Sequence, residues 1–217
     1  MSHARAERAA ISDLFERLGP DAPTLCAGWT AFDLAAHLVL RERRPAAAGG
    51  IALPALAGYT AGVQRALKER HGFEGLVRLV RSGPGGFYRL IPGMDEAVNT
   101  LEYFVHHEDL RRAQEGWAPR ELPPDLDNVI WKRLSAGARF MLRRSPVGVV
   151  LHRIGAPEGA QGRAVALGGP KGGPRVEVTG TAGELLLFCF GRQEHARVEL
   201  TGDPGAVARL KEAPLGV

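Results

Sequence analysis

The chain is poor in cysteine, with only Cys26 and Cys189 among 217 residues. These two residues lie far apart in the sequence, so a disulfide framework of the kind that holds small secreted domains is excluded. We expect both thiols to be free and the protein to be cytoplasmic, because isolated cysteines are typical of a reducing compartment. The charged, amphipathic start of the chain does not fit a secretory signal peptide.

Long apolar runs are also missing. No stretch approaches the roughly 20 apolar residues that a membrane-spanning helix needs, so we expect no membrane association. The net charge is +4 and the pI is near 9.4, which raises the question of nucleic-acid binding. However, the basic residues are scattered among 24 acidic ones, and the clusters near 41–44 and 143–144 fall where helices should end. Cations at helix ends complement the helix dipole, so we expect no nucleic-acid partner.

The first two-thirds of the chain is predicted to be helical. Thr30 followed by Asp33 is a capping-box pattern, and Pro45 must end the helix that begins there. Small residues over 46–54 and glycines over 82–86 are predicted to connect helices. From the spacing of apolar residues, helices are predicted over 3–18, 30–44, 59–81 with an interruption at Gly72, 95–114 and 123–144.

After Pro146 the pattern changes to short β-branched runs separated by glycine and proline turns. In residues 168–173, Lys171 is followed by glycine and not by the serine or threonine that ends a phosphate-binding loop, and no helix is predicted after it, so we interpret the segment as a turn. Strands are predicted over 147–154, 163–167, 175–178 and 196–200, with helices over 182–190 and 203–210. The sequence therefore predicts an α+β protein, with a helical bundle over 1–145 and a small β-β-β-α-β-α domain over 146–217 packed on it.

An acidic and an imidazole side chain share one face of the helix predicted over 95–114. Residues on a helix advance by about 100° each, so Glu102 and His106 differ by only about 40°. Val98 and Val105 lie on the same side, so we expect this face to point inward. Burying a carboxylate without a partner is costly or forces it to take up a proton. A divalent ion would remove that cost, and an (i, i+4) pair is well spaced to bind one.

A third ligand is needed, and His37 is the best candidate, because it lies on the core-facing side of the helix that begins at Thr30. His107 lies about 140° from Glu102 and is expected on the flank of its helix. The alternative without metal is a buried hydrogen bond between Glu102 and His106, or a helix edge where both reach water. A lone histidine on an apolar face is more often a core residue than a ligand, so the residue pattern leaves both readings open.

Two segments resemble a known family. Residues 28–38 read Gly-Trp-Thr-Ala-Phe-Asp-Leu-Ala-Ala-His-Leu and resemble the Gly-Trp-x-x-x-Asp-Leu-x-x-His-Leu signature of the DinB-like superfamily, in its mycothiol-dependent maleylpyruvate isomerase branch. Residues 102–109 resemble the Glu-x-x-x-His element of that branch. The resemblance covers the chain to about residue 145. It implies a four-helix bundle that binds zinc through His37, Glu102 and His106.

The resemblance extends more weakly into the C-terminal part. Residues 179–188, followed by a Gly-Arg pair, are similar to the sterol-carrier-like C-terminal domain of the same branch. This similarity implies that Arg192 faces the metal and holds substrate carboxylates, whereas the alternative is a cation at the end of a buried helix. Asp109 is expected to orient His106 or a water molecule. We interpret Cys26 as a buried structural thiol.

Three protein ligands leave one position of a zinc ion open, which is typical of catalytic sites. The leading hypothesis is a thiol-cofactor-dependent transferase or isomerase, with mycothiol or a similar low-molecular-weight thiol and a small anionic substrate as its partners, acting as a monomer or homodimer. One alternative is a metal-binding stress or sensor protein without catalysis. Another is a carrier of apolar ligands built on the C-terminal domain. Nickel, iron and manganese stay open beside zinc, because mixed histidine and carboxylate ligands suit several ions.

Overall fold

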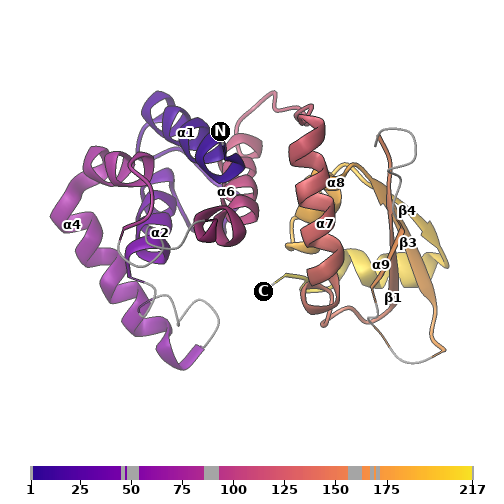
Figure 1. Ribbon diagram of the computed structural model, residues 1–217. Helices are drawn as coiled ribbons and strands as arrows, with labels where there is room; N and C mark the ends of the chain where they lie inside the picture. Colours follow the sequence, from indigo (N-terminus) through magenta and orange to yellow (C-terminus); the bar gives the residue numbers. More distant parts are fainter. Residues whose placement is uncertain are drawn as a thin grey trace. The chain divides into compact units, whose positions relative to one another are not determined.

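The computed structural model describes residues 2–44, 47, 54–85, 93–155, 163–166, 169 and 172–216. The predicted connection over 46–54 falls mostly outside the described residues, and half of the predicted turn over 168–173 does so too. The chain divides into two compact units, Met1–Trp117 and Ala118–Val217, each drawn in Figure 1 and described by itself below. Among the described residues, no helix combines the length and apolar character needed to cross a membrane.

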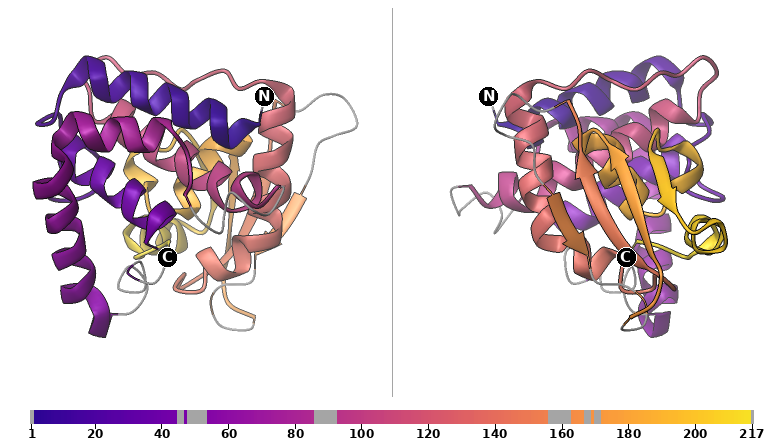
Figure 2. Two further views of the ribbon diagram at one scale, coloured as in Figure 1. Left: turned by 60° about the vertical axis from the view of Figure 1, so that its left-hand side comes forward. Right: turned by 90° about the vertical axis from the view of Figure 1, so that its right-hand side faces the viewer.

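The first unit is helical, as predicted. Helix α1 packs along α6, and α2 packs along α4 (Figures 1 and 2). Each end of these four helices lies within two residues of the position that the sequence predicted. Their bounds are α1 His3–Leu18, α2 Ala31–Arg43, α4 Ala57–Arg81, preceded by a 3-10 turn Pro54–Leu56, and α6 Met94–Arg112.

Local signals set where these helices begin and break. The Ser2 side chain accepts a hydrogen bond from the amide of Arg5, and Thr30 and Asp33 form the predicted capping box at the start of α2. Helix α4 is broken at Gly72, whose φ of 60° favours glycine. The core that the helices share includes Ile11, Phe15, Leu34, Leu38, Leu76, Val80, Tyr103 and Leu110.

Helix α6 is buried on more sides than its sequence pattern predicted. Every residue from 103 to 110 is buried. His107, predicted on the flank, is 6% exposed, and its Nδ1 lies 2.9 Å from Oε2 of Glu7 on α1. In contrast, Val98 is 37% exposed, and the Glu102 side chain is 28% exposed. The packing of α1 against α6 buries the side of α6 that carries His107. The side that carries Glu102 lies at the edge of the core.

The second unit combines a mixed sheet with three helices. The strand order is β2-β1-β3-β4, with β1 and β3 parallel and both outer pairs antiparallel. The right-hand view of Figure 2 looks onto this sheet. Its elements are α7 Pro124–Met141, β1 Gly148–Arg153, β2 Arg163–Ala166, β3 Arg175–Gly180, α8 Ala182–Cys189, a 3-10 turn Gln193–His195, β4 Glu199–Gly202 and α9 Pro204–Glu212.

Two details of this unit differ from the sequence-based expectation. The prediction placed α7 with the bundle, but α7 packs against α8 and β2 and belongs to the second unit. The reason is its apolar stripe of Leu126, Ile130 and Leu134, which is buried within this unit. The last strand begins not at residue 196 but at Glu199, where its pairing with Thr179 of β3 begins. The α+β class itself is confirmed.

Candidate metal centre

His37 lies in the middle of α2 and is 5% exposed. Its imidazole meets the indole of Trp29 with ring centroids 4.9 Å apart. On α6, the imidazole of His106 approaches it edge to face, with centroids 5.0 Å apart. The capping box sets where α2 begins, and the ring contact shows that His37 lies on the side of α2 that meets His106 of α6.

His106 faces a different carboxylate at each ring nitrogen. Its Nε2 lies 3.7 Å from Oε2 of Glu102, one turn earlier on α6. Its Nδ1 lies 2.9 Å from Oδ2 of Asp109, which is fully buried. The structure therefore brings His106 together with both other predicted ligands, His37 and Glu102, and with the predicted orienting residue Asp109.

One distance in this group is close to that of a zinc site. Zinc binds histidine nitrogen and carboxylate oxygen at about 2.0–2.2 Å, so the ligand atoms of a tetrahedral site lie roughly 3.3–3.5 Å from one another. The separation of 3.7 Å between His106 Nε2 and Glu102 Oε2 needs only a small adjustment to reach that value. Two imidazoles and one carboxylate are also a donor set that zinc and several other divalent ions accept.

Asp109 joins a loop to this group. The thiol of Cys26 donates to Oδ2 of Asp109 at 3.3 Å, and the amide of Leu25 donates to the Asp109 carbonyl at 3.0 Å. Cys26 was predicted to be a buried structural thiol, but it is half-buried and belongs to this cluster. No spacing rule predicts this contact, because it depends on how the loop folds onto α6.

A second donor set, made of Cys26, His106 and Asp109, has one ligand atom of each within 4.8 Å of the others, a condition that the predicted set of His37, Glu102 and His106 does not meet among the described residues. An ion bound there would use Nδ1 of His106 and would displace the hydrogen bond to Asp109. Histidines that bind metal usually donate their other ring N–H to a carboxylate. The hydrogen bond between His106 and Asp109 therefore leaves Nε2, the nitrogen that faces Glu102, as the ring atom available to a ligand.

Arg41 is a further charged residue at this group. Its Nη1 lies 3.1 Å from Oε2 of Glu102, the same oxygen that faces His106. Arg41 is one turn after His37 on α2, so the (i, i+4) spacing puts both on the same side of the helix. From the sequence, Arg41 was predicted only as part of the basic cluster at the end of its helix, because the pattern on one helix does not show which residue of another helix it meets.

Arg192 lies in the second unit, just after α8. Its Nη1 donates to the carbonyl of Phe190 at 2.5 Å, and its side chain is half-buried. This position agrees with a cation at the C-terminal end of a buried helix. A role for Arg192 toward a substrate stays a prediction.

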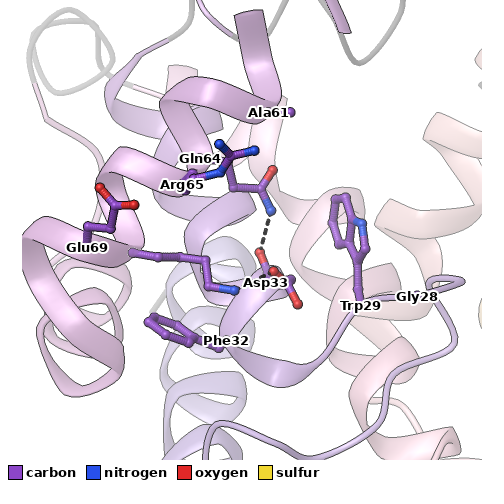
Figure 3. A pocket seen from close by; sticks show the side chains of 9 residues that line it. Gly28, Trp29, Phe32, Asp33, Ala61, Gln64, Arg65 and Glu69 are labelled. Atoms are coloured by element: carbon purple, nitrogen blue, oxygen red, sulfur yellow. Dashed lines mark hydrogen bonds and ion pairs between the residues drawn. The ribbon is translucent and has the colours of Figure 1, made fainter. Parts of the chain in front are cut away.

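A groove of about 550 Å³ lies beside Trp29, between the start of α2 and the facing side of α4 (Figure 3). The Lys68 ammonium is 2.7 Å from Oδ1 of Asp33 and lies 4.4 Å from the centre of the Phe32 ring. Burial would raise the pKa of Asp33, but hydrogen bonds from Lys68 and Thr30 outweigh it and hold that pKa below its usual value. The groove is lined by Gly28, Trp29, Phe32, Asp33, Ala61, Gln64, Arg65, Lys68 and Glu69.

Comparison with known proteins gives a likeness of structure. No protein-family model and no curated protein matches the chain. The crystal structure of the mycothiol-dependent maleylpyruvate isomerase matches with a TM-score of 0.50 and 18% identity over 92% of this chain and 90% of that one. A histidine-to-alanine mutant of that isomerase matches with a TM-score of 0.51, with the same identity and coverage. The chain therefore has a fold similar to that of mycothiol-dependent maleylpyruvate isomerase, as the resemblance of its sequence motifs predicted.

Proposed function

We propose that the first unit is a DinB-like four-helix bundle that binds one divalent metal ion, zinc in the first place, through His37, Glu102 and His106. The observation that carries this proposal is the position of His106, whose imidazole meets the ring of His37 and faces the Glu102 carboxylate. In this proposal Asp109 accepts the Nδ1 proton of His106 and so keeps Nε2 free to bind the ion.

We further propose that the protein is a thiol-cofactor-dependent transferase or isomerase that acts on a small anionic substrate. Zinc with three protein ligands would lower the pKa of a bound thiol and supply a thiolate nucleophile at neutral pH. The indole of Trp29 would cover one side of the His37 imidazole and exclude water from that side. The similarity to an enzyme whose name includes mycothiol supports a low-molecular-weight thiol as the cofactor.

In the second unit, which we propose to be sterol-carrier-like, Arg192 would hold a carboxylate of the substrate. The expectation of a cytoplasmic protein belongs to the same proposal, because low-molecular-weight thiols are kept reduced inside cells.

The contacts within the first unit favour a catalytic ion over one that only holds the helices together. Arg8 on α1 pairs with Glu42 on α2 at 2.6 Å and with Asp95 on α6 at 2.6 Å, so three helices are tied without an ion. His107 and Glu7 add a buried pair between α6 and α1. We therefore expect the metal-free protein to stay folded, whereas a structural ion would leave it unfolded when removed.

The test is the metal content of protein purified without an affinity tag, measured by elemental analysis beside circular dichroism. Wild type is expected to carry about one ion per chain, and His37→Ala, Glu102→Ala and His106→Ala to lose it while staying folded. Cys26→Ala is the matched control and keeps the ion. If Cys26→Ala and His106→Ala lose the ion but His37→Ala keeps it, the second donor set binds the metal. A wild type that binds neither zinc nor nickel would refute the metal centre altogether.

A further inference from the structure

One oxygen atom of Glu102 faces two side chains, those of Arg41 and His106. Oε2 lies 3.1 Å from Nη1 of Arg41 and 3.7 Å from Nε2 of His106. The carboxylate is 28% exposed and the Arg41 side chain is 18% exposed, so solvent reaches both groups. The oxygen that would bind an ion is therefore engaged by a guanidinium at the open side of the site.

The other arginines near the end of α2 are placed differently. Nη2 of Arg43 donates to the carbonyls of Leu79 and Gly83 and to the Ser82 hydroxyl, which holds it against the end of α4. Arg44 is exposed at the C-cap of α2. Arg41 is the arginine of α2 that the structure places on the Glu102 carboxylate.

A divalent ion and Arg41 would compete for this carboxylate. An ion pair that solvent reaches adds little to stability, so the guanidinium is easily displaced. Arginine stays charged at any physiological pH, and its planar fork matches the geometry of a carboxylate. Once the ion takes Oε2, the guanidinium is left next to the ion without its counter-ion.

We infer that Arg41 is the anion-binding residue of the metal centre, held by Glu102 until an ion takes that carboxylate and then available to a carboxylate of the ligand. This inference rests on the proposed function, because it needs an ion at Glu102. It gives the first unit its own anion site, independent of Arg192.

The test measures binding, not turnover, with two probes on the folded full chain. Zinc affinity is measured by calorimetry in competition with a chelator. Fumarate is then titrated into the zinc-loaded protein, because its two carboxylates point apart and cannot chelate one ion. Four proteins are compared, namely wild type, Arg41→Ala, Arg41→Lys and the control Arg44→Ala, which removes the same charge three residues away. Circular dichroism checks each fold.

Arg41→Ala is expected to bind zinc about two- to fivefold more tightly than wild type, the range that loss of a partly exposed ion pair corresponds to. It is expected to lose fumarate binding, which Arg41→Lys partly restores. Arg44→Ala should match wild type in both. Unchanged or weaker zinc binding in Arg41→Ala, or fumarate binding that persists in it, would overturn the inference while the metal centre stands. A wild type without zinc binding would refute the proposed function itself.

Discussion

The imidazoles of His37 and His106 meet edge to face, with their ring centroids 5.0 Å apart, although they come from different helices of the first unit. Both side chains are less than a tenth exposed. Imidazole is a common ligand of divalent metal ions, so the meeting of these two rings is the contact on which the proposed metal centre depends.

Replacing Asp109 by asparagine is predicted to weaken zinc binding by about 10- to 100-fold, the usual cost of losing a partner that orients a metal-bound histidine. The amide keeps the shape of the side chain but not its charge, so the acceptor for Nδ1 of His106 is lost or weakened. The measurement is the zinc dissociation constant, with thermal unfolding as the check on folding. Zinc affinity equal to that of wild type would mean that Asp109 does not orient the imidazole.

The two cysteines are predicted to differ in reactivity toward a thiol-specific reagent. Cys26 is half-buried in a loop, whereas Cys189 is fully buried in α8, where burial raises the pKa of its thiol. The folded protein should therefore react at one thiol per chain and the unfolded protein at two. Cys26→Ser should abolish the reaction of the folded protein and still keep the hydrogen bond to Asp109. Rapid labelling of Cys189 in the folded protein would contradict the packing of α8.

Asp33→Ala is predicted to destabilise the protein by about 1–2 kcal/mol, because it removes the capping box of α2. The lowered pKa of Asp33 also predicts in which direction the stability changes with pH. The stabilisation from its carboxylate is present above its ordinary pKa and is lost as the pH falls through the lowered one. Urea unfolding at several pH values should show this loss for wild type and not for Asp33→Ala. Asp21→Ala, an exposed aspartate outside the helix, serves as the control.

Glu42 is predicted to change the dependence of stability on pH in the opposite direction to Asp33. Burial raises its pKa above the ordinary value near 4.5, even though Arg8 on α1 opposes the shift. The folded protein then holds the proton more tightly than the unfolded chain, so this residue lowers stability as the pH rises from the ordinary pKa through the raised one. Glu42→Gln should flatten the dependence of the unfolding free energy on pH in that range. Glu74→Gln, at an exposed site, should leave the dependence unchanged, and equal curves for Glu42→Gln and wild type would refute the prediction.

The sequence predicted the helices of the first unit because their signals are local. The capping box at Thr30, the break at Gly72 and the spacing of apolar residues each act within one or two turns. The same holds for Glu102 and His106, whose relation is set by one helix. The α+β class followed in the same way from the change to β-branched runs after Pro146.

The remaining features depend on contacts between segments that are far apart in the sequence. Arg41 meets Glu102, Cys26 meets Asp109 and His107 meets Glu7 only because particular helices and loops pack together. The burial of His107 was missed because a helical wheel gives the angle of a residue but not which neighbouring helix covers it. The grouping of α7 with α8 was missed for the same reason, since an apolar stripe does not show its partner.

The two bonds that Asp109 makes to the loop have a mechanical consequence. Its carbonyl accepts the amide of Leu25, and its carboxylate takes both the Cys26 thiol and the His106 imidazole. The loop and the imidazole are thus held by the same residue, so a displacement of one is expected to displace the other. A ligand that pushed this loop outward would turn the imidazole of His106 with it, which couples the conformation of the loop to the orientation of that ring.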